Sequence, residues 1–280
     1  MKVLVTGGTG YLGTHVRKFF NADDLSRRGG RDLLDVDALT DIGEYDAVVH
    51  MAARLDRSFT TSAETFQTNV QGTINLLERV RKDAAFVFIS SKDVYGCFAG
   101  NYQNVPETCQ TMYSGQSAHE WSKLIAEHYV DYYAHQRAFR SCIFRLATPY
   151  APPSEGNTPN IIGHFANAVN FGESIRLPGK GRPIRDIMHV DDLAAACRSF
   201  IDSIIRHGTY NIGGGPKNAL SLREIVNRME EVSGLQAVID EENPLPDPTP
   251  YNYVTDLSRI DQELEWAPQI GIEDGLKTLF

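Results

Sequence analysis

Three glycines near the N-terminus have the type and spacing of an anion-binding loop. The stretch "VTGGTGYLG" places Gly7, Gly10 and Gly13 directly after a strand-like segment and at the start of a helix-like segment. Glycines allow a tight turn and a close approach of the backbone to a ligand, and the free N–H groups and dipole of the helix N-terminus attract a pyrophosphate. The sequence therefore predicts a dinucleotide-binding loop that includes Tyr11 and Leu12.

The residues after the second strand bear on the choice of cofactor. In "DDLSRRGG", a strand that ends at Leu25 puts Ser26, Arg27 and Arg28 where the adenosine ribose lies. Hydroxyl and guanidinium groups suit a 2′-phosphate, which favours NADP over NAD. The alternative is that both arginines are solvated and that Asp24 contacts the ribose.

The elements that must position these residues alternate between strand and helix. We expect strands over 2–7, 45–53, 85–91 and 141–147, and helices over 11–20, 63–82 and 119–136. This alternation predicts an α/β Rossmann-type fold, in which helices cover both faces of a doubly wound parallel sheet.

After Pro149 the alternation of strand and helix loosens. A helix over 189–205 and the strand "TYNIGG" could rejoin the first sheet, and Ser221 with Glu224 predicts a capping box for a helix over 221–234. We therefore expect two units in the chain. They are a dinucleotide-binding Rossmann domain over 1–152 plus about 189–215, and a smaller discontinuous α/β substrate-binding domain over 153–188 and 216–280.

Composition and charge exclude several classes of protein. The chain has 280 residues, of which 42% are hydrophobic, and no run approaches the roughly 18 apolar residues of a membrane span. The net charge of −9, without a basic stripe, argues against nucleic acid as a partner. The four cysteines form no CxxC pair and no signal peptide is recognisable, so we expect free thiols, no metal site and a cytoplasmic location.

Nine short motifs in the right order resemble the extended short-chain dehydrogenases/reductases, in particular the NAD(P)-dependent NDP-sugar epimerase/dehydratase family. Among them are "TGGTGYLG", "NVQGTINLLE", "FISSKDVYG", "GRPIRDIMHVDDLAAA" and "YNIGGG". The resemblance covers nearly the whole chain and implies hydride transfer between a nicotinamide and a sugar carbon, most often C4. It also implies cofactor contacts at Asp32, Leu33, Met51, Ala52, Ala53 and Asn69.

The resemblance assigns three catalytic roles, and one of the three residues departs from the family. A Ser hydroxyl holds the reacting sugar oxygen, a Tyr phenol moves its proton, and a Lys four residues later lowers the pKa of the phenol. Ser91 and Lys123 match the Ser and the Lys, and Lys123 would also hold the nicotinamide ribose. The position of the Tyr is occupied by His119.

Three hypotheses account for this departure. His119 relays the proton, because an imidazole is already a base at neutral pH and Lys123 keeps it neutral. Alternatively, catalysis has moved to Lys92 and Asp93, which occupy the place where related dehydratases hold an acid and a base. In the third hypothesis the redox step is absent, and the chain is a redox-silent protein that binds the cofactor or a sugar nucleotide.

The resemblance also implies where a sugar nucleotide binds. Arg185 matches an Arg that grips the substrate diphosphate, and a structural pair with Asp186 is the alternative. Leu177 would line the base pocket, Thr148 replaces an Asn of the family motif, and Asn160 either touches the substrate or caps a helix. The loop "NPLPDPTPYNYVTD" has no Arg or Lys where relatives often supply a second cation.

We therefore expect an NAD(P)-dependent enzyme that acts on a nucleotide-activated sugar as an epimerase, a dehydratase or an NADPH-dependent 4-ketoreductase. Many relatives pair through the two helices that correspond to 63–82 and 119–136. The resemblance thus implies a homodimer, to which Trp121 and Tyr132 contribute.

Overall fold

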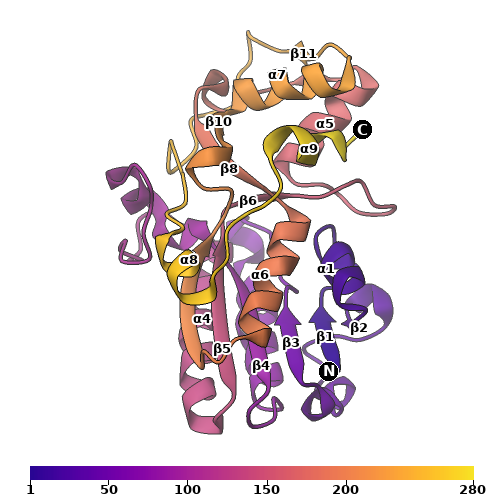
Figure 1. The fold of residues 1–280 in the computed structure, drawn as a ribbon, viewed down its shortest axis with the longest axis vertical. Coiled ribbons are helices and arrows are strands. Elements are labelled where there is room, and N and C mark those ends of the chain that lie inside the picture. The colour runs from indigo at the N-terminus through magenta and orange to yellow at the C-terminus, as the bar shows by residue number, and fades with distance from the viewer.

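The central element of the fold is a six-stranded sheet with the order β2-β1-β3-β4-β5-β9, seen in a computed structural model that describes residues 1–280 (Figure 1). Every strand pair in this sheet is parallel. The strands are β1 (Val3–Thr6), β2 (Asp23–Leu25), β3 (Ala47–His50), β4 (Ala85–Ser91), β5 (Arg140–Leu146) and β9 (His207–Ile212). The predicted Rossmann-type fold is confirmed.

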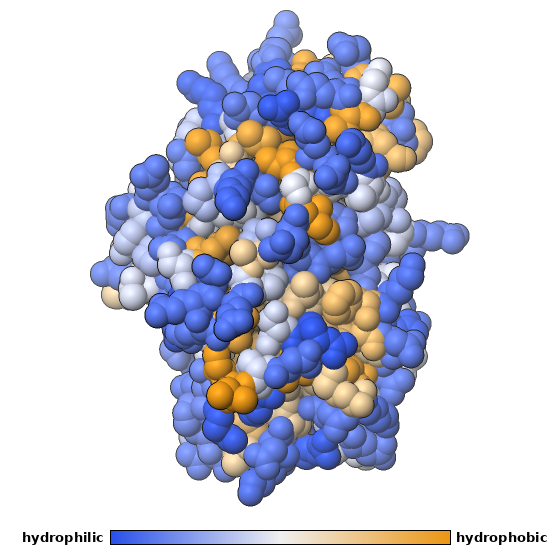
Figure 2. Space-filling view, viewed as in Figure 1, coloured by the Kyte–Doolittle hydropathy of each residue, from blue (hydrophilic) through white to orange (hydrophobic).

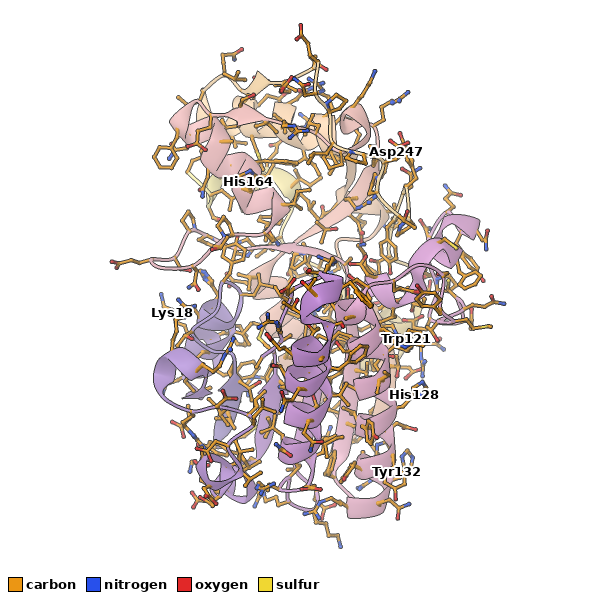
Figure 3. All side chains as sticks on the ribbon, turned by 180° about the vertical axis from the view of Figure 1, so that it is seen from behind. Lys18, Trp121, His128, Tyr132, His164 and Asp247 are labelled. Atoms are coloured by element: carbon orange, nitrogen blue, oxygen red, sulfur yellow. The ribbon has the colours of Figure 1, made fainter.

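Helices cover both faces of the sheet because side chains alternate along its strands. Val3 and Val5 of β1 point into one buried cluster, and Leu4 between them points into another. Figure 1 shows α1 (Gly13–Phe20) and α6 (Val190–Asp202) in front of the sheet. Figure 3, seen from behind, shows α2 (Ser62–Phe66), α3 (Gly72–Leu77) and α4 (Ala118–Arg137) on the opposite face.

The helix expected over 63–82 is divided by a wider turn. After α2 the chain makes a π-helical turn at Gln67–Gln71, and α3 then continues only to Leu77. Asn69, at the centre of this turn, is buried with its side-chain amide bonded to the main chain of Arg54. Apolar spacing cannot distinguish such a turn from regular helix, because the hydrophobic face on either side keeps nearly the same period.

A smaller α/β unit lies above the carboxyl ends of the sheet (Figure 1). It has a three-stranded sheet, β10-β8-β6, and a two-stranded sheet, β11-β7. The strands are β6 (Thr148–Tyr150), β7 (Ser174–Ile175), β8 (Ile184–His189), β10 (Ala219–Ser221) and β11 (Val238–Ile239). Its helices α5 (Ile161–Phe171), α7 (Leu222–Ser233) and α9 (Ile272–Lys277) enclose a separate apolar cluster. The predicted capping box of Ser221 and Glu224 is present at the start of α7.

One helix near the C-terminus lies outside this smaller unit. Helix α8 (Ser258–Leu264) places Ile260 and Leu264 in the apolar cluster of the main sheet, together with Trp266. Residues 216–280 therefore do not all pack in the smaller unit, which differs from the predicted division of the chain. The reason is that a short helix without a long apolar stripe gives no sequence signal of the sheet it covers.

The surface in Figure 2 is mostly hydrophilic, and its hydrophobic residues lie in separate patches. None of the helices combines the length with the apolar character that crossing a bilayer requires.

The strand order identifies where a ligand is expected in such a sheet. From β1 the chain goes to β2 on one side and then crosses to β3 on the other, so the direction of winding reverses between β1 and β3. Loops that leave neighbouring strands in opposite directions open a crevice at the carboxyl ends of those strands.

Candidate active site

A cavity of about 780 Å³ occupies this crevice and extends to the smaller unit. Its walls bring together the glycine loop, the ends of β3 and β4, the start of α4 and parts of β6 and β8. The predicted site residues that line it are Gly7, Gly10, Tyr11, Leu12, Gly13, Ser26, Arg27, Arg28, Asp32, Leu33, Met51, Ala52, Ala53, Ser91, Lys92, Asp93, His119, Lys123, Thr148, Asn160 and Arg185.

The glycine loop has a geometry that only glycine permits at its first position. Gly7 has a φ of 71°, and a Cβ there would lie 2.9 Å from the backbone N and Cα of Ala52. A Cβ on Gly13 would overlap the carbonyl oxygen of Gly7. Helix α1 begins without a side-chain cap and without an acidic residue in its first turn, and the amides of Tyr11, Leu12 and Gly13 donate to no protein group, so these three remain available for an anion.

At the end of β2, Ser26 and two arginines take up different roles. Arg27 is exposed and lines the cavity. Arg28 lines it too, but its guanidinium donates to the carbonyls of Thr9 and Gly156 and to Asn157, and so connects two loops. Arg27 is therefore the arginine with a free guanidinium at this end of the cavity.

The two acidic residues near this end of the cavity, Asp24 and Asp32, have different surroundings. Asp24 accepts a hydrogen bond of 2.6 Å from Ser26, and its other oxygen is buried without a partner. Asp24 does not line the cavity, whereas Asp32 does and accepts from the amide of Leu34 at 3.0 Å.

The predicted catalytic groups converge where β4 ends and α4 begins. The Ser91 hydroxyl oxygen accepts from the amide of Asp93 at 3.1 Å, which leaves its own proton free to be donated. Lys123 is buried, and its amino group donates to the carbonyl of Ile89 at 2.6 Å. Burial lowers the pKa of Lys123 to about 8.

His119 is buried in the cavity wall one helical turn before Lys123. Its Nδ1 donates to the carbonyl of Arg54 at 3.1 Å. Burial is the main cause that lowers the pKa of His119; Lys123 and Arg57 lower it further, and Glu120 acts in the opposite direction. The imidazole is therefore neutral at physiological pH.

Lys92 and Asp93 form an ion pair that Arg57 extends. The Lys92 amino group contacts one oxygen of Asp93, and Arg57 lies 3.2 Å from the other and 2.5 Å from Glu120. Burial would raise the pKa of Asp93, but Lys92 and Arg57 outweigh it and lower that pKa. Asp93 is therefore ionised and has no proton to donate.

Arg185 enters the cavity from β8 without a carboxylate partner. It donates to the carbonyls of Tyr251 at 2.7 Å and Pro250 at 3.0 Å. The alternative pair with Asp186 is not formed, because Asp186 instead accepts from the amides of Gly215 and Thr255. A nearly buried guanidinium that meets only carbonyl groups can still attract an anion.

The two other predicted substrate residues at this end are also placed by the fold. Asn160 caps α5, since its Oδ1 accepts from the amide of Gly163 at 3.3 Å, and it lines the cavity as well. Thr148 is 7% exposed on β6 and lines the cavity.

Two predicted contact residues are not brought to the cavity. Asn69 is turned toward the main chain of Arg54 and the hydroxyl of Ser122. Leu177 is buried in the apolar cluster of the smaller unit, and the neighbouring Pro178 lines the cavity in its place.

Sequence reasoning missed Arg31 and Arg57, which both line the cavity. Arg31 is anchored by Asp41, and Arg57 by Asp93 and Glu120. Arg31 follows the "SRRGG" segment, which we associated with the ribose only through Ser26, Arg27 and Arg28, and Arg57 comes from a loop without a recognised motif. After β3 the sequence "MAARLDR" holds two arginines, Arg54 and Arg57, and nothing in it indicates which of them lines the cavity.

Comparisons with known proteins agree with this arrangement. The model of the "NAD dependent epimerase/dehydratase family" matches residues 3–213. The chain is 26% identical to a CDP-paratose 2-epimerase of Salmonella typhi, over 100% of this chain and 98% of that protein. It is 29% identical to a dTDP-glucose 4,6-dehydratase of Escherichia coli, over 99% and 91%. A solved structure of MoeE5 in complex with UDP-glucuronic acid and NAD superimposes with a TM-score of 0.83 and 26% identity, over 99% and 97%.

Replacing Gly7 tests the crevice directly. We expect Gly7→Ala to weaken NADPH binding by at least about tenfold, because an added Cβ at φ 71° forces the loop away from Ala52. The binding is measured by fluorescence titration of NADPH.

Gly271→Ala is the matched control, since a Cβ there meets nothing within 4 Å. Unchanged NADPH affinity in a folded Gly7→Ala protein would contradict the assigned site.

Proposed function

The chain belongs to the NAD dependent epimerase/dehydratase family, and on this premise we propose that it transfers hydride at C4 of a nucleotide-activated sugar. One observation carries the proposal. A single cavity joins the glycine loop to Ser91, His119 and Lys123 and continues to Arg185 in the smaller unit. A dinucleotide at the first end and a sugar diphosphate at the other would meet at these three side chains.

The chain's own residues fit a dinucleotide. The unpaired amides that lead into α1, on a loop kept free of side chains at Gly7 and Gly10, suit a pyrophosphate, and we assign the nicotinamide ribose to Lys123 in the cavity wall. When bound, the nicotinamide supplies the hydride acceptor or donor. We favour NADP over NAD, since the unpaired guanidinium of Arg27 lines the expected ribose end, whereas the proton of the Ser26 hydroxyl is donated to Asp24.

The side chains around the reacting carbon would have different roles. Ser91 has a free proton with which to hold a sugar oxygen. The neutral imidazole of His119 accepts the proton of a sugar hydroxyl as hydride leaves the carbon, and returns a proton in the reverse step. Arg185 anchors the diphosphate.

Loss of water from the sugar is the second candidate reaction, and the contact between Lys92 and Asp93 in the cavity wall favours it. Because Asp93 is ionised, it would accept the proton from the carbon beside the transient ketone, and Lys92 would donate the proton that leaves with the departing hydroxyl as water.

We also propose that two copies of the chain pair through α2–α3 and α4. Tyr132 on α4 is 59% exposed, and it lies with Trp121 and His128 along the outward side of the helix (Figure 3). Light scattering of the purified protein measures its oligomeric state, and we expect the mass of a dimer.

The function is tested with CDP-paratose, dTDP-glucose and UDP-glucuronic acid, each incubated with NADP⁺ or NAD⁺ and analysed by NMR for altered sugars. For the compound that turns over, we expect His119→Ala to reduce kcat roughly 10²- to 10⁴-fold and His119→Tyr to retain or raise it. If His119→Ala kept full activity, this would indicate that Lys92 and Asp93, and not His119, handle the proton. Tight cofactor binding without turnover of any sugar would instead indicate a binding protein.

Arg27→Ala tests the cofactor preference. Loss of one charge-assisted contact to a 2′-phosphate should weaken NADPH binding about tenfold and leave NADH binding unchanged. Arg228→Ala is a control, because Arg228 on α7 pairs with Glu231 and does not line the cavity. Equal losses for the two coenzymes would contradict a 2′-phosphate contact.

The pH dependence follows from the lowered pKa of His119. Sugar oxidation needs the neutral imidazole, so its kcat/KM should rise with pH through a midpoint below the ordinary value of 6.5. In His119→Tyr the rise should move to higher pH, since a phenol titrates near 10 before Lys123 lowers its pKa. The same midpoint in both proteins would show that another group titrates.

A further inference from the structure

The main-chain carbonyl of Arg54 fixes the protonation pattern of the His119 ring. A carbonyl oxygen can only accept, so the 3.1 Å contact requires a hydrogen on Nδ1 of His119. The neutral ring carries one hydrogen, which leaves Nε2 with a lone pair. Nε2 has no protein partner and is not an enclosed atom, and His119 lines the cavity. Nε2 is thus the nitrogen that is open to a ligand.

Asn69 holds Arg54 in the position that this contact needs. Its Oδ1 accepts from the Arg54 amide at 2.7 Å, and its Nδ2 donates to the Arg54 carbonyl at 3.0 Å. The same Nδ2 donates to the Ser122 hydroxyl at 2.9 Å, and Ser122 donates to the carbonyl of His119 at 2.7 Å. One buried amide therefore restrains both the ring and the main chain of His119.

The π-helical turn provides the anchor for this amide. Asn69 lies at its centre, and its own carbonyl accepts from the Thr73 hydroxyl at 2.6 Å. Single π-helical turns leave the regular i→i+4 ladder and are common at functional sites.

We propose that Asn69 is a positioning residue that acts through the Arg54 carbonyl, holds His119 in the Nδ1–H tautomer and so assigns proton exchange with the substrate to Nε2. This inference rests on the proposed function in one respect, namely that His119 handles the proton. In comparable networks the group behind a histidine sets its tautomer, and loss of that group impairs proton transfer.

A second buried histidine supplies an internal reference with the opposite tautomer. The Thr73 hydroxyl donates its only proton to the main-chain carbonyl of Asn69. Toward Nε2 of His50, 2.9 Å away, the hydroxyl can therefore only accept, so Nε2 of His50 carries the hydrogen. The Nδ1 of His50 then accepts from the Thr6 hydroxyl at 2.6 Å. Burial lowers the pKa of His50 far below its usual value, so this ring is neutral as well.

The test is a long-range ¹H–¹⁵N correlation spectrum of the histidine side chains in the ¹⁵N-labelled full chain. The His119 signals are assigned by their loss in His119→Gln. In the wild type we expect His119 protonated on Nδ1 and His50 protonated on Nε2. A wild-type His119 that carries its hydrogen on Nε2 overturns the inference, whatever the turnover.

Two variants test the part played by Asn69. Asn69→Leu removes all the side-chain hydrogen bonds of Asn69 but keeps the main-chain carbonyl that accepts from Thr73. Asn69→Asp keeps the shape and the acceptor for the Arg54 amide but cannot donate to the carbonyl. In both variants we expect the His119 signals to move toward the Nε2–H form while those of His50 stay in place. Gln71→Ala is the matched control in the same turn, because the side chain of Gln71 is exposed and its one hydrogen bond goes to Asn75. If the His119 tautomer is unchanged in a folded Asn69→Asp protein, the inference is wrong.

The kinetic arm uses whichever of CDP-paratose, dTDP-glucose and UDP-glucuronic acid is turned over with NADP⁺. Asn69→Asp should lower kcat roughly 10- to 100-fold with KM unchanged, and Gln71→Ala should alter neither. The two proposals fail in different ways. Full activity of His119→Ala removes the proton relay alone, whereas a wrong tautomer in the spectrum removes the role of Asn69.

Discussion

The close approach of the glycine loop to the end of β3 is the contact on which the rest of the site depends. Gly7 leaves no room for a side chain against Ala52, so the loops after β1 and β3 lie nearly in van der Waals contact. This closeness brings the start of α1 to the crevice where the winding of the sheet reverses. The main chain that continues from Ala52 then reaches Arg54, whose carbonyl orients His119. The cofactor end and the proton-transfer end of the cavity therefore share one structural origin.

The cavity has an electrostatic character opposite to that of the whole chain. The protein carries a formal net charge of −9. Yet seven cationic side chains line the cavity against two carboxylates, Asp32 and Asp93. The cations are Arg27, Arg28, Arg31, Arg57, Lys92, Lys123 and Arg185. A concave surface of one sign focuses the field and concentrates ligands of the other sign, which suits two ligands that each carry a diphosphate.

Local patterns in the sequence were sufficient to predict the sheet and most of the residues in the cavity wall. Alternating strands and helices, the glycine spacing and the capping box at Ser221 each depend on residues close together in the chain. Partners distant in sequence were not foreseeable. Nothing near Arg57 indicates that it meets Glu120, which is 63 residues away. Likewise, the Asn69 motif predicts a residue at the cofactor, but not a π-helical turn that directs the amide to Arg54.

Arg185 shows how a loop without cations of its own is held in place where the cavity reaches the smaller unit. The guanidinium has five N–H donors, and three of its hydrogen bonds go to main-chain carbonyls, two of them on Tyr251 and Pro250 of the proline-rich loop. Two donors remain for a phosphate oxygen. This end of the cavity is thus formed when the chain folds. Binding of the proposed sugar nucleotide would therefore cost little conformational entropy in that loop. For the sugar nucleotide proposed above, the rigidity of the loop would then offset the weak attraction from a single cation.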